Sequence, residues 1–232
     1  MTDPTESTDP ENEPEVSDEG PGWMPAIMAG TLLMGILGFI FCAFSTWILF
    51  QQRTEFAIRT LRGSYIPQIE QSLLEPATKS SVVQQIQSLA ADMERGKYEH
   101  WQAQGIMQRL QRLPVIQWGE LQAIEAFLKT GADAQQDDAI AQLSRLQRAV
   151  ELGKVTSFDF EQVLEPVRRP DPNAPSGSQL IQPLTKEKID GVVQLARQVA
   201  DQAEVPDQRF DGVQIESIVQ HEIQMGASEG GF

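Results

Sequence analysis

The stretch that decides the fold is residues 23–50, WMPAIMAGTLLMGILGFIFCAFSTWILF, which lie inside a longer run, 20–52, without any Asp, Glu, Lys or Arg. Residues 26–48 alone would form a helix about 34 Å long at ~1.5 Å per residue, against a bilayer hydrocarbon core of ~30 Å. Trp23 and Trp47 bracket the run, as aromatic side chains do at the two headgroup layers. The sequence therefore predicts one transmembrane helix over residues 23–50.

The basic residues beside this run set its predicted orientation. Arg53, Arg59 and Arg62 follow the run, and no Lys or Arg precedes it. Because flanks rich in Lys and Arg stay in the cytoplasm, we expect the N-terminus outside and the C-terminal part inside. The expected location is a cell membrane, interpreted as the inner membrane of a bacterium. A cleaved signal peptide is the alternative, but it requires a basic start and an apolar stretch of roughly 7–15 residues.

One face of the predicted transmembrane helix carries small or hydroxyl-bearing side chains. These residues are Thr31, Gly35, Gly38, Cys42 and Ser45. Steps of four and three keep them on one face, and small side chains let helix backbones approach closely in lipid. The stripe predicts a parallel homodimer, or docking onto the span of a partner. The alternative is that such residues are simply common in spanning helices.

Charged residues are distributed unevenly along the chain. The net charge of −15 argues against nucleic acid as a partner. Residues 1–22 hold eight acids, no base and too few apolar side chains to fold, so we expect a disordered acidic tail. Residues 51–170 are nearly balanced, with 15 acids and 14 bases, whereas residues 171–232 are again acidic.

Few residues of the types used in catalysis or metal binding are present. One cysteine and two histidines, His100 and His221, exclude zinc sites built on Cys and His. His221 and Glu222 begin like a His-Glu-x-x-His zinc helix, but Met225 occupies the position of the second ligand. Glycine-rich phosphate loops and Gly-x-Ser-x-Gly turns do not occur in the sequence. We therefore expect no cofactor, no metal and no catalysis by the chain itself.

The periodicity of apolar residues after the apolar run is helical almost throughout. Val82, Ile86, Leu89 and Met93 recur at steps of three and four and predict a helix over residues 80–95. The fold class is therefore all-α, one transmembrane helix followed by a cytoplasmic domain of short helical hairpins. The predicted parts of that region are a juxtamembrane helical connector (51–79), a helical domain (80–165), a Pro-rich linker (166–183), a C-terminal helical hairpin (184–226) and a flexible tail (227–232).

A threefold internal repeat is one interpretation of the apolar spacing. The three units begin at Ile86, Leu143 and Val193, and the first two share Glu-x-Gly-Lys at the turn between their helices. The units are 57 and 50 residues apart, which weakens a regular array. The alternative is that any two amphipathic hairpins align at helical spacing.

Exposed aromatic residues would mark an interface, and Trp101 and Trp118 are the candidates for such a partner surface. The alternative is that both belong to the core.

In residues 51–62, Phe56, Ile58 and Leu61 alternate with arginines, so we expect this stretch to lie on the membrane or to extend from it as helix. The leading function is a membrane-anchored adaptor that presents its cytoplasmic domain to a protein partner. The alternatives are a subunit of a membrane-bound enzyme complex and a membrane sensor.

Overall fold

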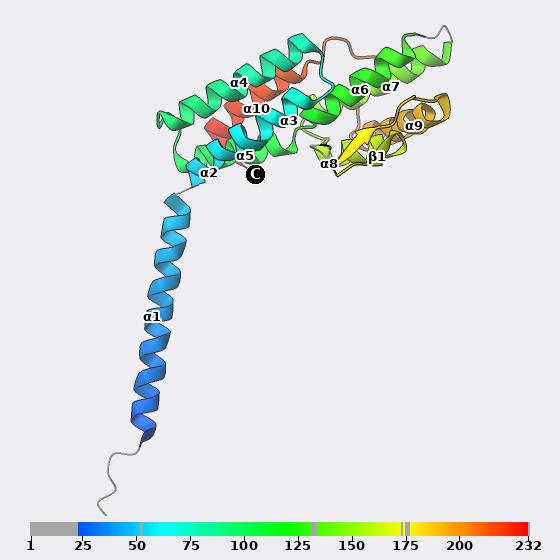
Figure 1. Ribbon diagram of the computed structural model, residues 1–232. Coiled ribbons are helices and arrows are strands. Elements are labelled where there is room, and N and C mark those ends of the chain that lie inside the picture. The colour runs from blue at the N-terminus through cyan, green and yellow to red at the C-terminus, as the bar shows by residue number, and fades with distance from the viewer. Residues whose placement is uncertain (1–22, 52, 131–133, 173, 175–176, 232) are drawn as a thin grey trace, which may run out of the picture. The chain divides into compact units, whose positions relative to one another are not determined.

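The computed structural model describes residues 23–51, 53–130, 134–172, 174 and 177–231, and the predicted acidic tail lies outside this part of the chain. The fold is all-α with one N-terminal apolar helix, as predicted (Figure 1). The chain divides into two compact units, Met1–Leu49 and Phe50–Phe232.

Helix α1, Trp23–Gln51, forms the described part of the first unit and extends two residues beyond it. Within it, Pro25–Trp47 is the one segment of the described residues that is long and apolar enough to cross a membrane, with a mean hydropathy of 2.3. None of that segment is buried inside the protein. The hydroxyls of Thr31 and Thr46 donate to the carbonyls of Ile27 and Cys42, each at 2.8 Å, so these polar groups are satisfied within the helix.

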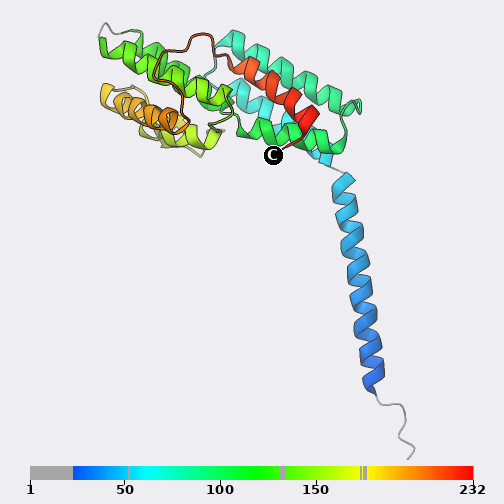
Figure 2. The ribbon, with the colours of Figure 1, turned by 180° about the vertical axis from the view of Figure 1, so that it is seen from behind.

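The second unit contains two helical bundles that lie side by side (Figure 2). The first bundle comprises α2 (Arg53–Thr60), the π-helical turn η1 (Leu61–Tyr65), α3 (Ile66–Gln71), α4 (Pro76–Glu94), α5 (His100–Arg112) and α10 (Ile215–Glu229). The second bundle comprises α6 (Val115–Leu128), α7 (Ala134–Glu151), α8 (Ser157–Leu164), the 3-10 turn η2 (Glu165–Val167), β1 (Arg168–Pro170), β2 (Ser178–Leu180) and α9 (Lys186–Gln202).

The C-terminal helix α10 closes the first bundle by packing on α5 and α4 (Figures 1 and 2). Two glycines permit the close approach: a Cβ on Gly105 would lie 2.4 Å from the carbonyl carbon of Gly230, and one on Gly226 2.6 Å from the Cα of Ile106. The buried Arg109 side chain donates to the carbonyl oxygen of Gly230 at 3.0 Å. The predicted flexible tail is thus wrong for residues 227–230, because α10 continues to Glu229 and Arg109 holds Gly230 against α5.

A buried arginine also holds the second bundle together. Arg145 of α7 is 2% exposed and donates to the backbone carbonyls of Val205 and Pro206, at 2.6 and 3.0 Å, in the segment that follows α9. The rings of Trp118 and Phe160 stack with their centroids 6.2 Å apart and join α6 to α8. These contacts hold the elements of the second bundle together, and the buried apolar residues of both bundles form one continuous core.

The Pro-rich stretch differs from the predicted linker. Arg168 pairs with Leu180 in an antiparallel hairpin of β1 and β2, and both Val167 and Leu180 are buried. The predicted boundary between domains therefore does not exist here, because these two apolar side chains dock the hairpin onto the second bundle. The predicted connector 51–79 likewise belongs to the first bundle, since Leu61 and Ile69 are fully buried.

The predicted C-terminal helical hairpin (184–226) is also wrong, because α9 packs on α7 whereas α10 packs on α5. The third predicted repeat unit fails with it, since Phe210 and Val213 lie in a non-helical segment. The same left-handed turn nevertheless ends α4 and α7, at Gly96 (φ 70°) and Gly153 (φ 69°). Such turns are common helix ends, so their recurrence does not distinguish duplication from chance alignment.

Candidate functional site

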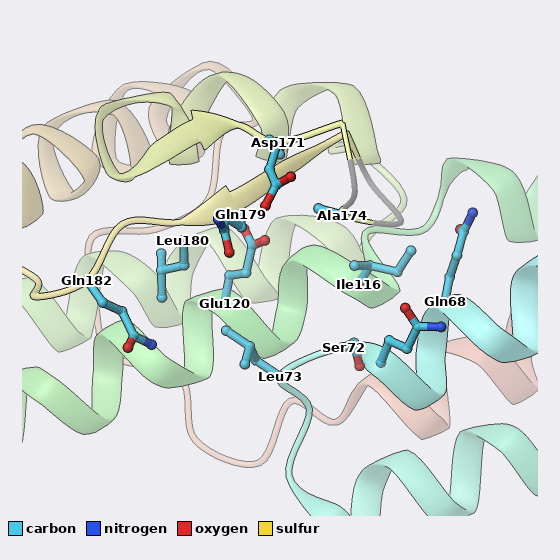
Figure 3. Close-up of a pocket in the computed structure, with 12 residues that line it drawn as sticks. Gln68, Ser72, Leu73, Ile116, Glu120, Asp171, Ala174, Gln179, Leu180 and Gln182 are labelled. Carbon is cyan, nitrogen blue, oxygen red and sulfur yellow. The ribbon is translucent and has the colours of Figure 1, made fainter.

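A cleft of about 320 Å³ lies where the two bundles meet, between α3, α6 and the β-hairpin (Figure 3). Amide side chains from both bundles line it. These are Gln68, Gln71, Gln179 and Gln182. Leu73, Ile116 and Leu180 add apolar surface, so the lining combines hydrogen-bonding groups with hydrophobic contacts. Such a lining can hydrogen-bond a ligand and also cover part of its apolar surface.

Close packing behind Leu73 fixes one wall of the cleft. Ser72 ends α3, and its hydroxyl donates to the carbonyl oxygen of Ile69 at 2.6 Å. The chain then crosses α6 at Gly119, where an added Cβ would lie 2.3 Å from the backbone nitrogen of Leu74. Leu74 is buried by this crossing, while Leu73 remains 48% exposed. The sequence Leu73-Leu74 therefore supplies both an anchor and an exposed apolar contact.

A buried ion pair connects α6 with the β-hairpin beside the cleft. Nε of Arg168 lies 2.7 Å from a carboxylate oxygen of Glu120, and the two side chains are 8% and 7% exposed. Such a pair holds its partners in place because a buried charge left without its counter-ion is costly. One of the two terminal nitrogens of the Arg168 guanidinium, Nη2, is buried and has no hydrogen-bond partner within the described part of the chain. The Glu120 carboxylate is therefore occupied by this ion pair, which holds the hairpin against α6.

The cleft is suited to binding. Among the described residues its lining has no histidine, cysteine, lysine or tyrosine; besides the glutamines it presents the hydroxyls of Ser72 and Ser178 and the carboxylates of Glu120 and Asp171. In the regions that the structure describes, no group of three or more His, Cys, Asp or Glu side chains could hold a metal ion. The lining can donate and accept hydrogen bonds through its glutamines and can cover apolar side chains of a ligand.

The two tryptophans predicted as a partner surface have different environments. Trp118 is 2% exposed, so its assignment to a surface is wrong: it stacks on Phe160 inside the second bundle. Trp101 is 49% exposed at the start of α5, and its Nε1 donates to a carboxylate oxygen of Glu99 at 2.6 Å. Only Trp101 of this pair is available to a partner.

The residues predicted to contact the membrane belong to both units. Trp23 and Trp47 are 77% and 57% exposed on α1. Arg59 pairs with Glu55, and Arg62 donates to Glu94 at 2.8 Å. The side chain of Arg53 lies outside the part that the structure describes. The positive charge that predicts the orientation is thus partly neutralised by nearby acids.

The small-residue stripe of α1 is accessible along the helix. A Cβ placed on Gly35 or Gly38 would meet nothing within 4 Å, and the Cys42 side chain is exposed. The dimer through Thr31, Gly35, Gly38, Cys42 and Ser45 remains a prediction.

Sequence reasoning missed the cleft because its walls come from segments far apart in the chain and from the stretch interpreted as a linker. A detectable signal was the pair Val167 and Leu180, two apolar residues that a solvated linker would not need.

Comparison with known proteins finds no match among family models, curated proteins or solved structures.

Proposed function

We propose that this protein is a single-pass membrane-anchored adaptor whose helical unit faces the cytoplasm and holds a segment of a protein partner in the cleft between its bundles. The observation that carries the proposal is the lining of this cleft, with glutamine amides beside exposed Leu73 and an acid that is already paired. Amides satisfy the backbone hydrogen bonds of a bound segment, and the apolar side chains of that segment cover Leu73 and Ile116.

The apolar helix supports the anchoring part of the proposal. Pro25–Trp47 is long and apolar enough to span a bilayer, and its exposed side chains are Leu, Ile, Met and Phe, which water solvates poorly. Arg53, Arg59 and Arg62 favour the cytoplasm for the unit that follows. A reporter fused after residue 232 tests this orientation, and activity restricted to a cytoplasmic reporter is the expected result.

Site-directed crosslinking in native membranes tests the adaptor role. A photo-reactive amino acid at Gln179 of the full-length protein should form a discrete adduct with a partner. Leu73→Glu should reduce that adduct about tenfold, because the new carboxylate replaces an apolar contact and lies close to Glu120 and Asp171. Leu73 is exposed, so the substitution leaves the core intact.

Leu152→Glu is the matched control, because Leu152 is a similarly exposed leucine, 45% against 48%, in the turn after α7. It should leave the adduct unchanged. Equal adducts in both variants, or no adduct specific to the cleft, would contradict the proposed binding site.

A further inference from the structure

Two exposed aromatic side chains lie on α2 and α5, two helices of the first bundle. Phe56 of α2 is 53% exposed and Trp101 of α5 is 49% exposed. Neither belongs to the cleft between the bundles. We refer to Phe56, Arg59 and Trp101 together as the proximal surface.

Direct contacts bring the two helices of the proximal surface together at their N-terminal ends. The hydroxyl of Thr54 lies 2.7 Å from Nδ1 of His100, and α2 packs along α5 (Figure 1). Phe56 comes two residues after Thr54, and Trp101 directly follows His100. The Trp101 ring also lies beside Gly230, at the end of α10. The two aromatic residues are therefore carried by helices that meet at one corner of the first bundle.

The length of chain between the apolar segment and this corner limits their separation. Thr54 follows Trp47 by seven residues, which span at most about 24 Å when fully extended. If Trp47 is held in a headgroup layer, the proximal surface stays within reach of that layer. Tethering over so short a distance gives the surface a high effective concentration at the membrane.

The chemistry of the proximal surface fits the headgroup layer of a bilayer. The Trp101 side chain is 49% exposed, and its indole nitrogen already has a hydrogen-bond partner in Glu99. Arg59 is three residues after Phe56 and therefore lies on the same side of α2. Its pair with Glu55 is exposed, and such pairs contribute little, so the guanidinium can exchange its partner for a lipid phosphate.

We propose that the proximal surface docks the helical unit onto the bilayer that holds α1, with Phe56 and Trp101 inserted among the headgroups and Arg59 at lipid phosphates. This inference rests on the proposed membrane anchoring. It narrows the expectation that residues 51–62 lie on the membrane or extend from it as helix: Leu61 is fully buried and Ile58 packs against the core, so only Phe56 of the three apolar residues remains for lipid.

Quenching of tryptophan fluorescence by lipids brominated near the headgroup end of their acyl chains tests the proposal. The full-length protein is placed in nanodiscs of phosphatidylcholine and phosphatidylglycerol, with Trp118 retained in every variant because it is buried. Trp23→Phe/Trp47→Phe reports Trp101, and Trp23→Phe/Trp101→Phe reports Trp47. Brominated lipid should quench about half of the Trp101 emission, as for a ring at headgroup depth.

The two reporters separate the docking surface from the anchor. Quenching of Trp47 without quenching of Trp101 would overturn the docking and leave the anchoring intact. Absence of quenching at Trp47 would overturn the anchoring itself. Trp23→Phe/Trp47→Phe/Trp101→Phe gives the background from Trp118.

A second variant tests Phe56 directly. Phe56→Ser should lower the quenching of Trp101 at least twofold, because it removes half of the inserted aromatic area. Phe127→Ser changes an exposed phenylalanine near the C-terminal end of α6, in the other bundle, and should have no effect. Nanodiscs of phosphatidylcholine alone should weaken the quenching if Arg59 binds anionic lipid. Equal quenching in Phe56→Ser and the unsubstituted reporter would remove Phe56 from the proximal surface.

Discussion

The ion pair of Arg168 and Glu120 shows how single side chains hold the hairpin beside the cleft. Removing one partner leaves the other charge buried, which typically costs about 3–5 kcal/mol. We expect Arg168→Met to lower the free energy of unfolding by that order. The double variant Arg168→Met/Glu120→Leu should be more stable than Arg168→Met alone, since no charge is then stranded. Denaturant unfolding followed by Trp118 fluorescence, in the Trp23→Phe/Trp47→Phe/Trp101→Phe background, measures both.

The exposed pair of Arg197 and Asp138 provides the comparison. Its two atoms lie 2.6 Å apart, but the side chains are 49% and 58% exposed. Arg197→Met should therefore change stability by less than about 1 kcal/mol. If Arg168→Met lowered the free energy of unfolding no more than Arg197→Met does, burial would not explain the contribution of the Arg168–Glu120 pair to stability.

Glu125 on α6 gives the stability a pH dependence. Burial raises the pKa of this carboxyl above its ordinary 4.5, although Gln147 donates a hydrogen bond to it at 2.8 Å. The folded state therefore favours the protonated form of Glu125. Its contribution to the free energy of unfolding is complete below pH 4.5 and is lost as the pH rises through the raised pKa. Glu125→Gln should be more stable than the native chain at neutral pH. Unfolding curves at several pH values should show this difference vanish below pH 4.5.

At the scale of single elements, the local sequence predicted the helices well and their partners poorly. Val82, Ile86, Leu89 and Met93 define the buried face of α4, as predicted. Thr156 and Asp159 form a capping box that opens α8, a pattern that the local sequence contains. Periodicity shows which face of a helix is buried but not which element covers it. The sequence therefore predicts a hairpin of α9 with α10, whereas α9 packs on α7 and α10 packs on α5.

The packing of α5 against α10 depends on the absence of side chains at the crossing. Gly105→Ala would place its Cβ 2.4 Å from the backbone of Gly230, so the two segments must separate. Overpacking of this kind typically costs about 1–3 kcal/mol. We expect this loss in the free energy of unfolding, measured by denaturant titration.

Gly63→Ala is the control for that substitution. A Cβ at Gly63, within η1, meets nothing within 4 Å, so no clash opposes the change. Because alanine favours helix over glycine by up to about 1 kcal/mol, this variant should be as stable as the native chain or slightly more stable. Equal destabilisation of both variants would show that the α5–α10 approach is not responsible.

In the molecule as a whole, the apolar helix is predictable from the sequence and the cleft is not. A single continuous run of apolar residues identifies α1, so no tertiary information is needed. The cleft requires α3, α6 and β2 to meet, which depends on Gly119 and on the pair of Arg168 with Glu120. No local pattern contains a contact between residues so far apart in sequence.

The return of α10 to the first bundle gives the sharpest prediction for the molecule as a whole. Deleting residues 213–232 should uncover Ile106 and the rest of the α5 face, while α7 and α9 keep their contacts. Hydrogen exchange should therefore speed up in α4 and α5 by at least about tenfold, with little change in α7 and α9, because local opening follows lost burial. A C-terminal hairpin would instead expose α9.

The full-length variant Gly226→Leu separates loss of packing from loss of chain length. Its side chain would collide with the backbone of Ile106, so it should reproduce the faster exchange of α4 and α5 with every residue present. Faster exchange of α9 in either variant would mean that α9 and α10 stabilise each other. Slow exchange of α5 in both would mean that the first bundle folds without its C-terminal helix.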